Sequence, residues 1–99
     1  MADRKVTWTK RALKQFSQAI NYVAEDSPQN AEKLRIDITA KTKRLINTPE
    51  IFSLDKYKFN NDGNYRAFEL HRYRIAYKIT AQKIIIFRIR HTSREPEFY

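Results

Sequence analysis

The sequence contains no cysteine, which excludes disulfide bonds and thiolate metal sites. It has one glycine and three prolines in 99 residues, and it shows no long linker, repeat or low-complexity segment. No run of 18 apolar residues is present, so we expect no transmembrane helix. The opening residues, MADRKVTWTK, are too polar for a signal peptide. These features predict a single domain over residues 1–99 in the cytoplasm, with no membrane partner.

The common catalytic motifs are also missing. The sequence has no Gly-rich phosphate loop, no HExxH and no nucleophile elbow, and His71 and His91 do not have metal-ligand spacing. Glu95 and Glu97 lie in an end segment that we expect to be mobile, which argues against hydrolysis by a carboxylate pair. We therefore expect no metal and no cofactor.

Positive charge is what the sequence has in excess. Twenty Lys and Arg against eleven Asp and Glu give a net charge of +9. Residues 1–50 hold ten basic and six acidic side chains, whereas residues 65–94 hold eight basic side chains and one acidic side chain, Glu69. This distribution is typical of a protein that meets phosphates or an acidic partner, although a generic basic surface also fits it.

The first half of the chain predicts a strand and two helices. Val6 and Trp8 alternate with polar residues over 5–9, which predicts a short half-buried strand, and Thr9 can cap a following helix. Apolar residues then recur at helical spacing and predict helices over roughly 10–25 and 28–47. The turn between these helices is short enough that they form an antiparallel hairpin.

Capping and turn residues support these boundaries. Ser27 suits an N-cap and Pro28 suits the first position of the second helix, where a missing N–H has no cost. Residues 50–64 are irregular, and NNDGN at 60–64 marks a loop or hairpin tip.

The second half predicts three consecutive strands with short, antiparallel connections, at about 65–70, 72–79 and 83–91. In the middle strand, one face carries the apolar side chains Tyr73, Ile75, Tyr77 and Ile79. In the last strand, we expect Ile85, Phe87 and Ile89 to share the apolar face. The order β-α-α-β-β-β predicts an α+β fold in which the helix hairpin packs on one face of a small, mainly antiparallel twisted sheet.

Basic side chains should gather on the other, open face of this sheet. The strand pattern places Arg74, Lys78, Arg88 and Arg90 there, and the tail 92–99 should emerge at its edge. Arginine, histidine and tyrosine together suit phosphodiester chemistry, because arginine stabilises the phosphorane and His or Tyr can move protons. Each residue also has a structural explanation, as a solvated charge, a strand-end histidine or a frayed terminus.

The segments VTWTKRALKQF, YRAFEL, RYRIAYKI and IIIFRIRHTSREPEFY resemble the RelE/ParE superfamily of toxins from bacterial type II toxin–antitoxin modules, often described as plasmid stabilization proteins. The resemblance covers essentially the whole chain. It implies a cognate antitoxin, acidic and folding on binding, as the partner.

The resemblance implies one of two targets. RelE-like members are mRNA interferases that act on the ribosome, and Arg74, Tyr99 and a further basic residue would then be catalytic. Arg94 matches that further residue, with Arg90 or His91 as alternatives. Arg66, Lys78, Arg88 and Arg90 would bind nucleic acid or target.

ParE-like members instead poison DNA gyrase and need no nuclease site; RIRH followed by TSRE fits the end of their last strand. We predict mRNA cleavage, with gyrase poisoning as the alternative. A non-catalytic nucleic-acid-binding module is a further possibility. Whether the chain is an enzyme therefore stays open at this point.

Overall fold

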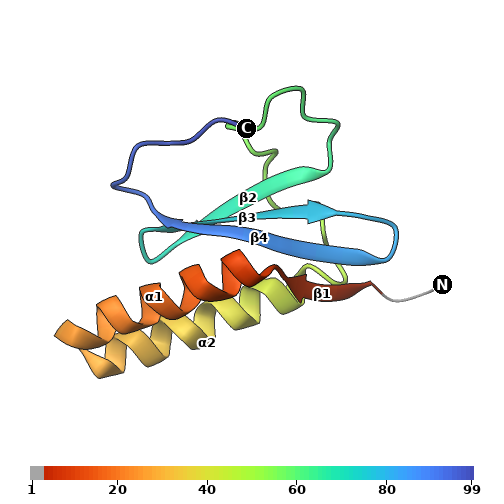
Figure 1. Ribbon diagram of the computed structural model, residues 1–99. Helices are drawn as coiled ribbons and strands as arrows, with labels where there is room; N and C mark the ends of the chain where they lie inside the picture. The colour runs from red at the N-terminus through yellow and green to blue at the C-terminus, as the bar shows by residue number, and fades with distance from the viewer. Residues whose placement is uncertain (1–3) are drawn as a thin grey trace.

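A computed structural model describes residues 4–99. It has one short strand, two helices and three further strands in the expected order (Figure 1). Their bounds are β1 Lys5–Trp8, α1 Lys10–Asp26, α2 Pro28–Arg44, β2 Tyr65–Leu70, β3 Tyr73–Ile79 and β4 Lys83–His91. The two helices lie side by side beneath the sheet, which confirms the α+β prediction. No helix within residues 4–99 combines the length and apolar character needed to cross a membrane.

The helix boundaries follow the capping residues. The Thr9 side chain accepts a hydrogen bond from the backbone N–H of Ala12 and caps α1. Ser27 does the same for Asn30 at the start of α2, where Pro28 occupies the first turn. The predicted second helix was three residues too long, because the chain turns after Arg44.

The sheet has the order β1-β4-β3-β2. β2, β3 and β4 pair antiparallel, as expected from their short connections. β1 pairs parallel with residues 83–86 of β4, and the backbone N–H of Thr9 donates to the carbonyl of Ile86 at 3.0 Å. Beyond Ile86, β4 has no strand neighbour on this side within the described residues.

A β-bulge in β4 corrects the predicted facing of the last strand. Ala76 pairs with Arg88 but Tyr77 pairs with Ile86, so Phe87 is the extra residue. Ile84, Ile86 and Ile89 therefore share the buried face. The prediction was right for Ile89 and wrong for Ile85 and Phe87. The bulge also lets Phe87 and Arg88 both reach the other face.

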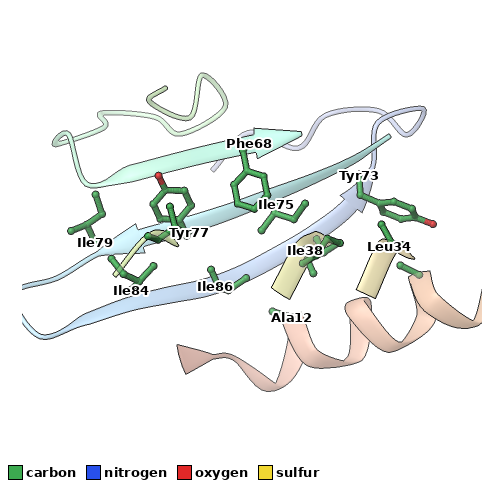
Figure 2. Packing of buried hydrophobic residues seen from close by; sticks show 13 residues of the cluster. Ala12, Leu34, Ile38, Phe68, Tyr73, Ile75, Tyr77, Ile79, Ile84 and Ile86 are labelled. Carbon is green, nitrogen blue, oxygen red and sulfur yellow. The ribbon is translucent and has the colours of Figure 1, made fainter. Parts of the chain in front are cut away.

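The core lies between the sheet and the helices (Figure 2). The predicted face of β3 is buried: Tyr73, Ile75, Tyr77 and Ile79 are all at most 7% exposed. They pack with Leu34 and Ile38 of α2 and with Ala12 and Ala19 of α1. The Tyr77 hydroxyl finds a partner by donating to the carbonyl of Pro49 at 2.7 Å.

The outer face of the sheet is covered, which corrects the expectation of an open basic face. Residues 53–55 run along the edge of β2, where the N–H of Asp55 donates to the carbonyl of Tyr65 at 2.8 Å. The C-terminal tail then arches back to the 50–64 segment (Figure 1). There the N–H of Tyr99 donates to the carbonyl of Tyr57 at 3.0 Å, and the N–H of Phe59 donates to the carbonyl of Tyr99 at 2.6 Å.

Candidate functional site

Asp55 is the centre of a hydrogen-bonded cluster on the outer face of the sheet. It is only 3% exposed and accepts from the guanidinium of Arg74 at 2.9 Å. It also accepts from the hydroxyl of Tyr99 at 2.5 Å and from the N–H of Tyr57 at 3.1 Å. Three chain segments far apart in the sequence therefore converge on one buried carboxylate.

Protonation in this cluster is strongly biased. Burial opposes the ionisation of Asp55, but hydrogen bonds from Tyr99, Arg74 and the N–H of Tyr57 outweigh burial and lower the pKa of Asp55. Burial, reinforced by the hydrogen bond to Asp55, raises the pKa of Tyr99 far above its ordinary value. At neutral pH, Asp55 is a carboxylate and Tyr99 is a neutral donor.

Arg74 is enclosed by this cluster. Its side chain is 12% exposed, and its second ion pair is with Glu69 at 3.0 Å. Its guanidinium also lies over the ring of Tyr57, 4.9 Å from the centroid. Burial works to lower the pKa of Arg74, but the bonds to Asp55 and Glu69 raise it overall, so the side chain is fixed in its charged form.

Arg88 and Arg90 are held by the tail. Arg88 donates to the carboxylate of Glu97 at 2.7 Å and lies over the ring of Tyr99. Arg90 donates to the carbonyl of Arg94 at 3.1 Å. Glu97 thus compensates the charge of Arg88, while the ring of Tyr99 and the carbonyl of Arg94 hold the two guanidinium groups in place.

The other two predicted binding residues lie on the same sheet but have different surroundings. The ammonium of Lys78 lies 5.2 Å from the centroid of Tyr65. Arg66 donates to the carbonyls of Phe52 at 2.7 Å and Glu50 at 3.3 Å, so it anchors the irregular segment. Its buried Nε has no partner among the described residues.

His91 and Arg94 lie apart from the cluster around Asp55. His91 lies beside Tyr73, a residue of the core face, with the ring centroids 5.1 Å apart, and its Nδ1 is 2.7 Å from the hydroxyl of Ser93. Arg74 follows Tyr73 in β3 and therefore faces the opposite side of the sheet. The four predicted catalytic residues thus form two groups: Arg74 with Tyr99, and His91 with Arg94.

His91 and Arg94 line a cleft of about 700 Å³ between α1, the unpaired part of β4 and the tail. At its floor, the N–H of Ile89 donates to the side-chain oxygen of Gln15 at 2.8 Å. Four arginines contribute to its walls, namely Arg11, Arg88, Arg90 and Arg94. Within residues 4–99, no three His, Asp or Glu side chains are grouped to hold a metal ion.

Sequence reasoning missed the groups that hold the basic residues in place. Asp55 and Tyr57 lie in an irregular segment without periodicity, so no pattern connects them with β3. Gln15 is one of several polar residues of α1, and nothing in the sequence marks it as the half-buried one that faces β4. The available indication was the excess of strand arginines, for which acidic and aromatic side chains elsewhere in the chain are suitable partners.

Comparison with known proteins defines the class. A solved structure described as "Chromosomal ParDE TA system from P. aeruginosa" matches with a TM-score of 0.68 and 20% identity, over 89% of this chain and 95% of that chain. At this identity the likeness shows that this chain shares its fold with a chain of that structure. None of the curated proteins matches.

The family follows from the sequence itself. Residues 6–96 match the family described as "ParE toxin of type II toxin-antitoxin system, parDE". The chain therefore belongs to the ParE toxin family. This places it in a toxin–antitoxin system and implies an antitoxin partner, and the predicted mRNA cleavage gains no support from it.

Proposed function

We propose that this chain arrests bacterial growth by poisoning DNA gyrase. The observation that carries the proposal is the match to the ParE family over residues 6–96, which is nearly the whole chain. ParE-like toxins need no nuclease site. This proposal replaces mRNA cleavage as our main interpretation.

The geometry of the candidate site supports this choice. Cleavage of RNA requires groups that exchange protons near neutral pH. The raised pKa of Tyr99 keeps its hydroxyl neutral, and its proton is already donated to Asp55. His91 lies on the other side of the sheet from Arg74. The arrangement therefore suits binding to a target better than acid–base catalysis.

A supercoiling assay tests the proposal. Purified gyrase with ATP and relaxed plasmid should lose supercoiling activity when the chain is added, and cleaved DNA should accumulate. In cells, induction should damage DNA without creating new messenger RNA 5′ ends inside translated codons. Growth arrest with such cuts and with unaffected gyrase would overturn the proposal.

The cleft beside β4 is our proposed docking place for the antitoxin. The unpaired edge of β4 offers main-chain hydrogen-bonding groups to a further strand. The side-chain oxygen of Gln15 already accepts from the N–H of Ile89, as the carbonyl of a neighbouring strand would. The walls hold four arginines against two glutamates, Glu95 and Glu97, and this positive excess favours an acidic segment that orders on binding.

Charge reversal in the cleft tests the docking place. Arg11→Glu and Arg94→Glu should weaken antitoxin binding by about tenfold or more per residue, since each leaves like charges facing each other. Lys33→Glu on the exposed side of α2 makes the same charge change away from the cleft and should have little effect. Isothermal titration calorimetry with the antitoxin measures the difference, and equal losses from all three variants would contradict the assignment.

A further inference from the structure

Two phenylalanines stand exposed on the outer side of the molecule where the tail meets the 50–64 segment. Phe59 is 60% exposed and Phe98 is 57% exposed. Their rings are stacked, with centroids 5.5 Å apart and planes 29° from parallel. Tyr57 packs edge-on against Phe98 at 5.3 Å. Two adjacent exposed rings offer an apolar surface on which a ligand can pack.

Two lysines lie over tyrosine rings that neighbour the phenylalanines. The ammonium of Lys56 lies 5.2 Å from the centroid of Tyr57, and that of Lys58 lies 4.9 Å from the centroid of Tyr65. Within the described part of the chain, neither lysine pairs with an Asp or Glu side chain, unlike Arg74 and Arg88 deeper on the same face. The ammonium of Lys58 does donate to the terminal oxygen of Tyr99 at 3.5 Å. Lys56, which is exposed, offers its charge to an anion, and Lys58 would have to share or exchange its main-chain partners to do so.

The rings are held in position by the main chain. Tyr57 and Phe59 are bound to Tyr99 by the reciprocal pair of backbone hydrogen bonds described above. The carbonyl of Phe59 also accepts from the ammonium of Lys58 at 3.0 Å. A surface that is already ordered loses little conformational entropy when a ligand arrives.

We propose that Phe59, Phe98, Lys56 and Lys58 form a binding platform for single-stranded nucleic acid. Exposed aromatic rings offer stacking surfaces to unpaired bases, and lysines near them can bind the phosphate backbone. In a duplex, the base faces are already stacked on one another and cannot reach the rings. The high positive charge of the chain favours nucleic acid over an uncharged protein surface.

This platform is separate from the antitoxin cleft. None of its four residues lines the cleft beside β4. The inference also does not depend on gyrase, since it concerns a nucleic acid bound directly by the chain. Its success or failure can therefore be measured with no other protein present.

Fluorescence anisotropy with a labelled oligothymidylate of roughly 12 nucleotides tests the proposal, since this length spans the site sizes of single-strand binders. The parent chain should bind this probe more tightly than a duplex of the same length. A Phe59→Ala/Phe98→Ala variant should bind it roughly tenfold or more weakly, because stacking on the rings is lost.

Two further variants separate stacking from other effects. Leu13→Ala/Ile36→Ala removes two side chains that are each 51% exposed on the helices, and it should leave binding unchanged. Lys56→Gln/Lys58→Gln should weaken binding and reduce its salt dependence. Circular dichroism checks that the phenylalanine variant is folded. If this folded variant binds the probe as tightly as the parent chain does, the proposal is wrong. Equal affinity for duplex and single strand would overturn it as well.

Discussion

At the scale of single residues, Asp55 determines whether the outer face of the sheet is organised. It joins β3, the irregular segment and the chain end through Arg74, Tyr57 and Tyr99. A buried carboxylate is stable only when such partners compensate its desolvation. Loss of Asp55 would leave the buried guanidinium of Arg74 with Glu69 alone, and the tail would lose its side-chain anchor.

We therefore expect Asp55→Ala to lower the free energy of unfolding by about 3–5 kcal/mol, as for a broken buried ion pair. Urea denaturation followed by circular dichroism measures this change. Lys56→Ala, at the exposed neighbouring position, is the matched control and should change stability little. A loss of similar size in both variants would mean that the segment, and not the carboxylate, is responsible.

The same cluster predicts how stability depends on pH. Because the pKa of Asp55 is lower in the folded protein than its ordinary value of 3.8, the folded state binds this proton less readily than the unfolded state. The contribution of Asp55 is present above pH 3.8 and is lost as pH falls through the lowered pKa. Asp55→Asn should flatten this acid limb of a stability–pH profile, and an unchanged limb would contradict the assignment.

The basic half of the cluster could be predicted from the sequence, but its acidic half could not. Alternation along β3 places Arg74 and Lys78 on the face opposite Tyr73 and Tyr77, because strand geometry alone decides it. Asp55 reaches Arg74 through an irregular segment whose path depends on packing across the whole sheet. A local sequence pattern cannot predict such a long-range contact.

At the scale of elements, the junction of β1 and α1 connects the helix pair to the sheet. Thr9 uses its N–H to bind Ile86 in β4 and its hydroxyl to cap α1. One residue thus fixes both the last pairing of β1 and the direction in which α1 leaves it. The cap was predictable because its residue type and position are local features.

Thr9→Ala should lower the free energy of unfolding by about 0.5–2 kcal/mol, the usual cost of losing an N-cap oxygen. Ser17→Ala, in the exposed middle of α1, is the matched control and should be neutral or slightly stabilising because alanine favours helix. Thermal and urea denaturation of both variants give the comparison. An unchanged Thr9→Ala variant would show that packing, and not the cap, holds the start of α1.

The bulge at Phe87 is an element that periodicity could not predict. The run Ile84 to Phe87 is apolar throughout, so alternation gives no unique choice of buried face. In the structure, Phe87 is the extra residue and packs against Tyr65 and Tyr99 on the outer side of the sheet. Because Tyr65 and Tyr99 come from β2 and the tail, the sequence of β4 alone could not predict this contact.

At the scale of the whole molecule, the net charge of +9 is the dominant feature. The tail and the 50–64 segment compensate only part of it, through the ion pairs of Arg74 and Arg88. The remaining like charges repel one another and destabilise the compact state at low ionic strength.

Added salt should therefore raise the melting temperature of the free toxin, because screening weakens this repulsion more than it weakens the few buried ion pairs. Differential scanning calorimetry across a series of KCl concentrations measures the slope. The antitoxin complex, with its charge neutralised by an acidic partner, should show a smaller slope. A melting temperature that falls with salt would mean that attractive ion pairs outweigh the repulsion.

The parallel pairing of β1 with β4 has a consequence for the timing of synthesis. β1 is made first, yet its strand neighbour is made last, and the outer face is completed only by residues that follow β4. While the chain is still attached to the ribosome, α1 and α2 have no sheet to cover. The sheet, the outer face and the cleft beside β4 can therefore form only after β4 and the residues that follow it have been made.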